Sequence, residues 1–68
     1  MKKKLKNIFI RDVILHDTVK LIATGEKAII VWMDEENIDN DSFLLEVKGK
    51  DVDFLGSYQR NEFKKIND

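Results

Sequence analysis

The residues between Asp34 and Asp41, with the sequence DEENIDND, form the densest group of acidic side chains in the chain. Carboxylate oxygens suit calcium, and a calcium loop places them at fixed positions along about twelve residues. A loop starting at Asp34 would put Ile38 and Leu45 at two ligand positions. The spacing therefore argues against a metal site. We interpret the acids as an exposed recognition loop, with the side chains Asp34, Glu35, Glu36, Asp39 and Asp41.

Catalytic side chains are scarce. His16 is the only histidine and there is no cysteine, so a Ser-His-Asp site would have to use His16 as its base. Ser42 and Ser57 do not lie in a G-x-S-x-G context. His16 precedes Asp17 in a predicted turn, which is typical of a surface histidine. The sequence predicts no catalytic residue, no cofactor and no enzymatic activity.

Basic residues gather at the N-terminus, where the first eleven residues contain no acid. Together with Trp32, these lysines could bind single-stranded nucleic acid by contacting phosphates and stacking a base. The pI of about 5.8 argues against this function, because nucleic-acid-binding domains typically have values above about 9. Nucleic-acid binding therefore remains the alternative hypothesis, with the contacts Lys2, Lys3, Lys4 and Lys6.

The length of 68 residues predicts one domain, residues 1–68, with residues 1–6 as a basic, flexible tail. A chain this short buries little surface and has no cysteine for a disulfide, so oligomerisation is the natural source of extra stability. Arg11 and Asp12 interrupt the only apolar stretch near the N-terminus, which excludes a signal peptide of the usual form. No apolar run reaches the roughly 18 to 20 residues of a membrane span, so we expect a cytoplasmic protein.

Residues 18–24 and 27–33 are two runs rich in β-branched side chains, and Gly25 and Glu26 separate them. This pattern predicts a β-hairpin with a two-residue turn. Because side chains alternate between the faces of a strand, one face would be wholly apolar. The predicted core face consists of Val19, Leu21, Ala23, Ala28, Ile30 and Trp32.

The opposite face of this hairpin is about half apolar, which is unusual for a surface that meets only water. We interpret it as a candidate interface, formed by Ile22, Ile29, Val31 and Met33, with Leu44 and Leu55 as further candidates. Three explanations are open. The chain could cover this face with its own N-terminal strand or C-terminal helix, a second copy could cover it, or a different protein could do so.

A second hairpin is predicted around Gly49 and Lys50. Its apolar face would pair Val47 with Val52, Leu45 with Phe54, and Phe43 with Gly56. This register also places Glu46 opposite Asp53, and two like charges directly opposite each other are unfavourable. A nearby lysine or a shifted turn would relieve the repulsion.

The two ends of the chain are harder to assign. Residues 6–16 are rich in β-branched and aromatic residues and predict a strand, with a β-bulge near Arg11 and Asp12. Residues 57–68 fit a short helix capped by Ser57, or a further strand. The expected fold is mainly β: a small antiparallel meander, or an SH3-like or Sm-like barrel, of about five strands with or without this C-terminal helix.

These features predict a small, non-enzymatic binding or regulatory protein that acts through protein–protein contacts. We expect it to associate with itself, with another protein, or with both. Compact cysteine-free chains of this kind are often accessory factors of bacteria or their phages.

Overall fold

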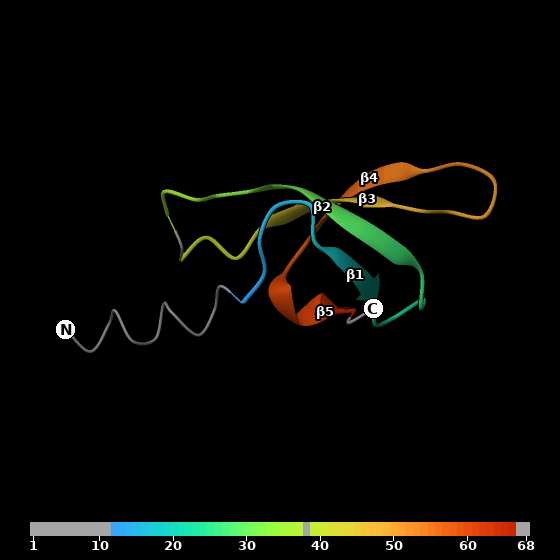
Figure 1. The fold of residues 1–68 in the computed structure, drawn as a ribbon, viewed down its shortest axis with the longest axis horizontal. Coiled ribbons are helices and arrows are strands. Elements are labelled where there is room, and N and C mark those ends of the chain that lie inside the picture. The colour runs from blue at the N-terminus through green and yellow to red at the C-terminus, as the bar shows by residue number, and fades with distance from the viewer. Residues whose placement is uncertain (1–11, 38, 67–68) are drawn as a thin grey trace.

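The computed structural model describes residues 12–37 and 39–66, and the fold is a single antiparallel sheet (Figure 1). The strand order is β4-β3-β2-β1-β5. The elements are β1 (Thr18–Leu21), β2 (Lys27–Met33), β3 (Phe43–Val47), β4 (Phe54–Tyr58), the 3-10 turn η1 (Arg60–Glu62) and β5 (Phe63–Lys65). The mainly β prediction is confirmed. The sheet is open rather than closed into a barrel, because β4 and β5 are its two edges.

The first hairpin has a longer turn than the sequence predicts. Val19 pairs with Ala28 instead of Trp32, because residues 22–26 all lie outside the strands. The Gly25 amide donates to the Leu21 carbonyl over 2.8 Å, and Gly25 has a φ of 81°, which glycine adopts without strain. Ala23 therefore lies in an exposed turn, and its assignment to the core was wrong.

A β-bulge in β2 exchanges the faces of two large side chains. The pairing with β3 shifts between Ile30 and Trp32, so that Val31 is an extra residue in the strand. One extra residue moves every later side chain to the other face. Trp32 is consequently 47% exposed and Met33 only 7% exposed, the reverse of the predicted arrangement.

The core lies on one face of the sheet, which we call the inner face. The rings of Phe43 and Phe63 meet edge to face there, with their centroids 5.4 Å apart. Val13 joins them from the segment before β1. The alternation of buried and partly buried residues in β1 and β3 follows the sequence pattern. The buried side chains are Val13, Val19, Leu21, Ala28, Ile30, Met33, Phe43, Leu45, Val47 and Phe63.

The second hairpin is also shifted, and in Figure 1 it projects beyond the rest of the sheet. Val47 pairs with Phe54, so residues 48–53 form the connection and Val52 lies in it, 70% exposed. The shift is by an even number of residues and preserves the predicted faces. Glu46 no longer opposes Asp53, and Lys48 contacts both carboxylates at 3.6 and 3.2 Å. The shifted turn and the nearby lysine, which are the two expected ways of relieving the repulsion, therefore both occur.

Residues 12–16 are not a strand, contrary to prediction. Ile14 and Asp17 close a turn around His16: the Asp17 amide donates to the Ile14 carbonyl at 3.1 Å, and the Ile14 amide to the Asp17 carboxylate at 3.0 Å. The predicted turn at His16 is confirmed. Arg11, most of the predicted bulge and the basic tail 1–6 lie outside the described residues.

The C-terminal segment forms a strand after one turn of 3-10 helix. Ser57 lies within β4 and caps no helix, and Gln59 precedes η1 instead. β5 then pairs with β1, which brings the Phe63 side chain to 1% exposure in the core. Burial of this ring stabilises the β5 strand. Within the described ranges, no helix is long and apolar enough to cross a membrane.

Candidate interaction surface

β4 is an edge strand without charge. Its sequence is FLGSY, and it pairs with β3 on one side only, with no described strand on the other side. An edge strand presents a row of backbone N–H and C=O groups that can pair with another chain, and proteins usually protect such edges with charged residues, proline or bulges. β4 has no charged residue and no proline, and Phe54 and Leu55 are 44% and 62% exposed. Within residues 12–37 and 39–66, this edge is therefore open to strand addition.

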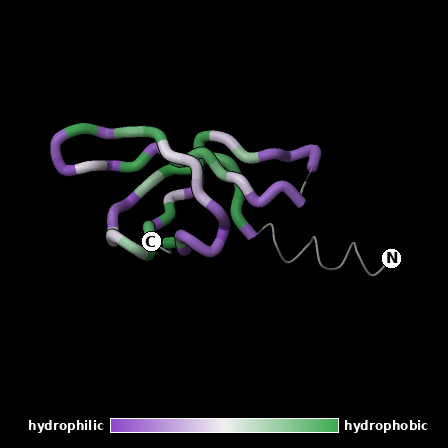
Figure 2. The backbone as a smooth tube through the Cα atoms, turned by 180° about the vertical axis from the view of Figure 1, so that it is seen from behind, coloured by the Kyte–Doolittle hydropathy of each residue, from purple (hydrophilic) through white to green (hydrophobic). Residues whose placement is uncertain are grey.

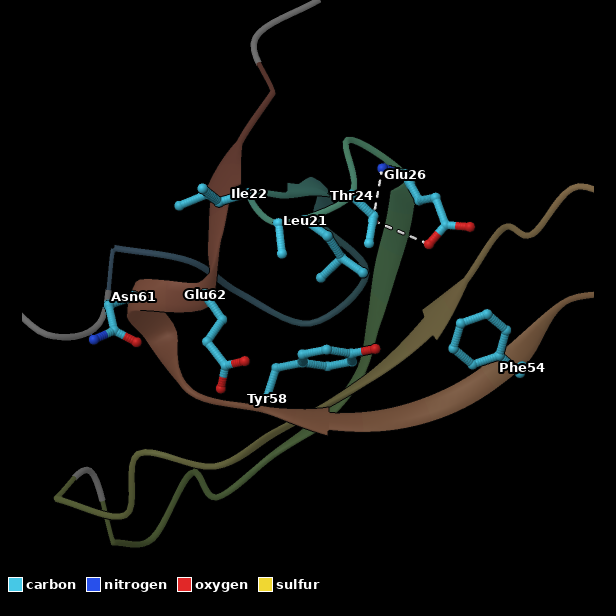
Figure 3. Close-up of a pocket in the computed structure, with 9 residues that line it drawn as sticks. Leu21, Ile22, Thr24, Glu26, Phe54, Tyr58, Asn61 and Glu62 are labelled. Carbon is cyan, nitrogen blue, oxygen red and sulfur yellow. Dashed lines mark hydrogen bonds between the residues drawn. The ribbon is translucent and has the colours of Figure 1, made fainter.

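A groove of about 380 Å³ borders the inner face of β4. Figure 3 shows the Tyr58 ring below Leu21, with Phe54 further along β4 and Ile22 on the opposite wall. Ile22 is 60% exposed. A groove lined by aromatic and aliphatic side chains can accommodate an apolar side chain of a partner.

The acidic rim of the groove is held in place by hydrogen bonds. The Thr24 hydroxyl donates to the Glu26 carboxylate over 3.0 Å, and the Gln59 backbone amide donates to the Glu62 carboxylate over 3.0 Å. Glu26 and Glu62 both line the groove, so its entrance carries negative charge. Such a rim disfavours a phosphate-bearing ligand at this site.

Tyr58 reaches its position in the groove because Gly56 has no side chain. A Cβ atom placed on Gly56 would lie 2.6 Å from the Tyr58 Cε1 atom, well inside van der Waals contact. The ring thus folds back over the backbone of its own strand, an arrangement that compensates for glycine in an edge strand. The shape of the groove depends on this pair of residues.

Arg60 ties the other edge of the sheet to the N-terminal side of the molecule. Its guanidinium donates to both carboxylate oxygens of Asp12 at 2.8 and 2.9 Å and to the Phe63 carbonyl at 2.6 Å, and it lies 4.9 Å from the Phe63 ring centroid. The hydrogen bond from Arg60 lowers the pKa of Asp12, and the same bond raises the pKa of Arg60. β5 is therefore anchored by contacts that β4 lacks.

The acidic loop is ordered around Asp34. Its carboxylate accepts hydrogen bonds from the Glu36 and Asn37 amides at 3.1 and 3.0 Å and from the Asn40 side chain at 3.1 Å. Asp41 accepts the Arg60 amide at 2.9 Å. These two acids have structural roles, whereas Glu35, Glu36 and Asp39 are exposed on a hydrophilic tip (Figure 2). Within the described residues, no group of acids and histidine could hold a metal.

The structure does not bring the four predicted interface residues together. Ile22 lies in the groove wall, Ile29 and Val31 are partly exposed on β2, and Met33 is buried in the core because of the bulge. The sequence interpretation missed Phe54, because it placed this residue opposite Leu45 in the core. The lack of charge in FLGSY is the signal that could have identified the edge.

The predicted nucleic-acid site combines N-terminal lysines with Trp32. Lys2, Lys3, Lys4 and Lys6 lie outside the described residues. Trp32 borders a second pocket, of about 340 Å³, whose lining includes Asp34, Glu35 and Glu36. These acids would repel a phosphate chain from the exposed indole ring.

Comparison with protein-family models, with curated proteins and with solved structures finds no match to this chain. The function must then be inferred from the surface itself. Among its features, the open edge of β4 and the groove beside it form the best-defined place for another molecule to bind.

Proposed function

We propose that this protein is a non-enzymatic binding module that self-associates through β4, with two copies pairing antiparallel at this edge. The observation that carries the proposal is the uncharged, exposed edge strand from Phe54 to Tyr58. A small domain without disulfides gains stability when such an edge is covered.

A second copy is the partner that β4 fits best. Two identical strands can pair about a two-fold axis, and such a contact closes after two subunits. If the axis passes through Gly56, each Phe54 lies opposite Tyr58 of the second copy, and each Leu55 lies opposite Ser57 of the second copy. Aromatic cross-strand pairs are favourable, and no like charges meet in this register.

The expected dimer is weak. Burying the exposed parts of Phe54 and Leu55 in both copies contributes on the order of 5 kcal/mol. Each new backbone hydrogen bond adds about 0.5 to 1.5 kcal/mol. Association costs at least about 4 kcal/mol, so we expect dimers only at roughly micromolar concentrations or higher.

We infer that the sheet is the incomplete wall of an SH3-like or Sm-like barrel, because β5 returns beside β1 and the bulge in β2 bends the sheet. The lack of cysteine supports a reducing compartment, and we propose an accessory or regulatory role in the cytoplasm. Binding of a different protein strand at β4 would use the same edge.

The test is size-exclusion chromatography with light scattering over a range of protein concentrations. We expect the wild-type mass to rise toward that of a dimer, and Leu55→Lys to remain monomeric because it places charge on the edge. Val52→Lys is the matched control, since Val52 is an equally apolar and exposed residue outside β4. A wild-type protein that stays monomeric up to about millimolar concentration would overturn self-association.

A further inference from the structure

Four lysines line up across the outer face of the sheet, opposite the core. Lys20 of β1 is the direct partner of Lys27 on β2 and of Lys64 on β5. The Lys48 amide donates to the Lys27 carbonyl over 2.8 Å, which places Lys48 next in the row. Their chain neighbours Val19, Ala28, Val47 and Phe63 are buried, so the lysines point outward. We call Lys64, Lys20, Lys27 and Lys48 the lysine row.

This alignment lowers the stability of the folded protein, because like charges directly opposite each other in a sheet repel. Lys48 is neutralised by Glu46 and Asp53. Among the described residues, no carboxylate lies within ion-pair distance of Lys20, Lys27 or Lys64. Three neighbouring positive charges therefore face solvent without a counterion from the described part of the chain.

We propose that the lysine row binds the phosphate backbone of single-stranded nucleic acid. Adjacent strands lie about 4.8 Å apart, so the row is a line of closely spaced charges suited to a polyanion. The described residues form no α-helix that could enter the groove of a duplex, which favours a single strand.

The low pI of the whole chain does not exclude this site, because the densest acidic segment lies at the opposite end of β2 from the lysine row. Lys27 begins this strand, and the acidic loop starts at Asp34, directly after its last residue. Seven residues of strand separate the two by about 20 Å. The separation directs a polyanion to the lysine end of the sheet.

The experiment measures the fluorescence anisotropy of a labelled oligothymidine at several salt concentrations. Three phosphate contacts give a slope of about −2 in a plot of log affinity against log salt. We expect Lys20→Gln to weaken binding about threefold to tenfold at low salt and to reduce the slope by about 0.7. Thermal unfolding should show unchanged or increased stability for this variant, because a repulsion is removed.

Lys50→Gln is the matched control, since Lys50 is exposed in the 48–53 connection and lies outside the row. It should leave affinity within twofold of the wild type, apart from a small general charge effect. The proposal is overturned if the oligonucleotide does not bind at low salt, or if Lys20→Gln and Lys50→Gln lose affinity equally.

A competing occupant of the row is the acidic loop of a second copy. In that case the protein would self-associate in a salt-sensitive way and would not bind the oligonucleotide. Both Lys20→Gln and Glu35→Gln would abolish this self-association. This result would replace the nucleic-acid proposal. Pairing through β4 is independent of both, because Lys20 lies outside β4 and Lys20→Gln should leave the β4 dimer intact.

Discussion

The two edges of the sheet differ in how they are protected. β5 has three residues, of which Phe63 is buried and Lys64 and Lys65 carry charge. β4 has five residues, none of them charged, and Phe54 and Leu55 are largely exposed. Short length and charge are two of the known ways to prevent strand addition. The length and charge of β5 therefore protect its edge against strand addition, whereas β4 has neither protection.

The edges also differ in what holds them to the molecule. β5 is fixed by the Phe43–Phe63 contact and by the ion pair between Arg60 and Asp12. β4 is held by its pairing with β3, by the hydrogen bond between the Ser57 and Ser42 hydroxyls, and by Tyr58, which is partly buried against the core. Substitutions at β5 should therefore change folding stability, and substitutions at β4 should change association.

The largest difference should appear when a phenylalanine is truncated at each edge. Phe63→Ala removes a buried ring, and we expect a loss of about 3 to 5 kcal/mol, enough to unfold a domain of this size. Phe54→Ala should cost the monomer about 1 kcal/mol or less, because the ring is 44% exposed. Urea unfolding of dilute protein measures both values. Similar losses for the two variants would contradict the assignment of the edges.

A sharper test of β4 concerns the close contact between Gly56 and Tyr58. Gly56→Ala introduces a methyl group where the ring lies, and we expect destabilisation of about 1 to 3 kcal/mol. The double variant with Tyr58→Ala should lose less stability than the sum of the two single variants, because the clash is gone. A double-mutant cycle measures the coupling. Strict additivity would mean that the ring does not pack over Gly56.

At the β5 edge, Arg60→Gln should reduce stability by about 1 to 2 kcal/mol, a value that allows for the partly exposed Asp12 carboxylate. Because Arg60 lowers the pKa of Asp12, the ion pair stabilises the fold above the ordinary Asp pKa of about 4. This contribution is lost as the pH falls through the lower pKa of the folded state. Urea unfolding between about pH 6 and 2 should show a smaller acid-induced loss in the variant.

Asp12→Asn is the control for this pair, since it removes the titrating group and leaves the guanidinium. It should also flatten the acid-induced loss. If both variants kept the pH profile of the wild type, the ion pair would have no role in anchoring β5.

The smallest effect on stability is expected at His16, which lies outside both edge strands. Its substitutions test backbone strain and not the contacts of either edge. His16 has a φ of 74°, a conformation that costs a side-chain-bearing residue about 1 to 2 kcal/mol. His16→Gly relieves this strain, offset by the larger entropy of the unfolded chain, so we expect a gain of up to about 1 kcal/mol. His16→Ala should not stabilise the protein, and thermal unfolding of both variants checks the difference.

The inner faces of most strands could be predicted from the sequence, because alternation survives a register shift of an even number of residues. Val19, Leu21, Leu45 and Val47 are buried as expected although both turns are longer than predicted. The bulge at Val31 could not be predicted, since nothing in IIVWM marks the extra residue. It alone explains why Trp32 and Met33 exchanged places.

The candidate surface was harder to predict than the core, because it depends on strand order rather than on local pattern. Which strand becomes an edge is decided by the pairing of β5 with β1, two segments that are distant in sequence. The lysine row has the same origin, since Lys20, Lys27 and Lys64 align only after three strands have paired. Hydrophobic periodicity carries no information about either contact.

Amide hydrogen exchange, followed as a function of protein concentration, compares the two edges within one sample. If β4 pairs with a second copy, exchange at residues 54–58 slows as concentration rises through the dimerisation range, while exchange at residues 63–65 stays constant. Exchange at 54–58 that does not depend on concentration, in a protein that remains monomeric, would contradict self-association through β4.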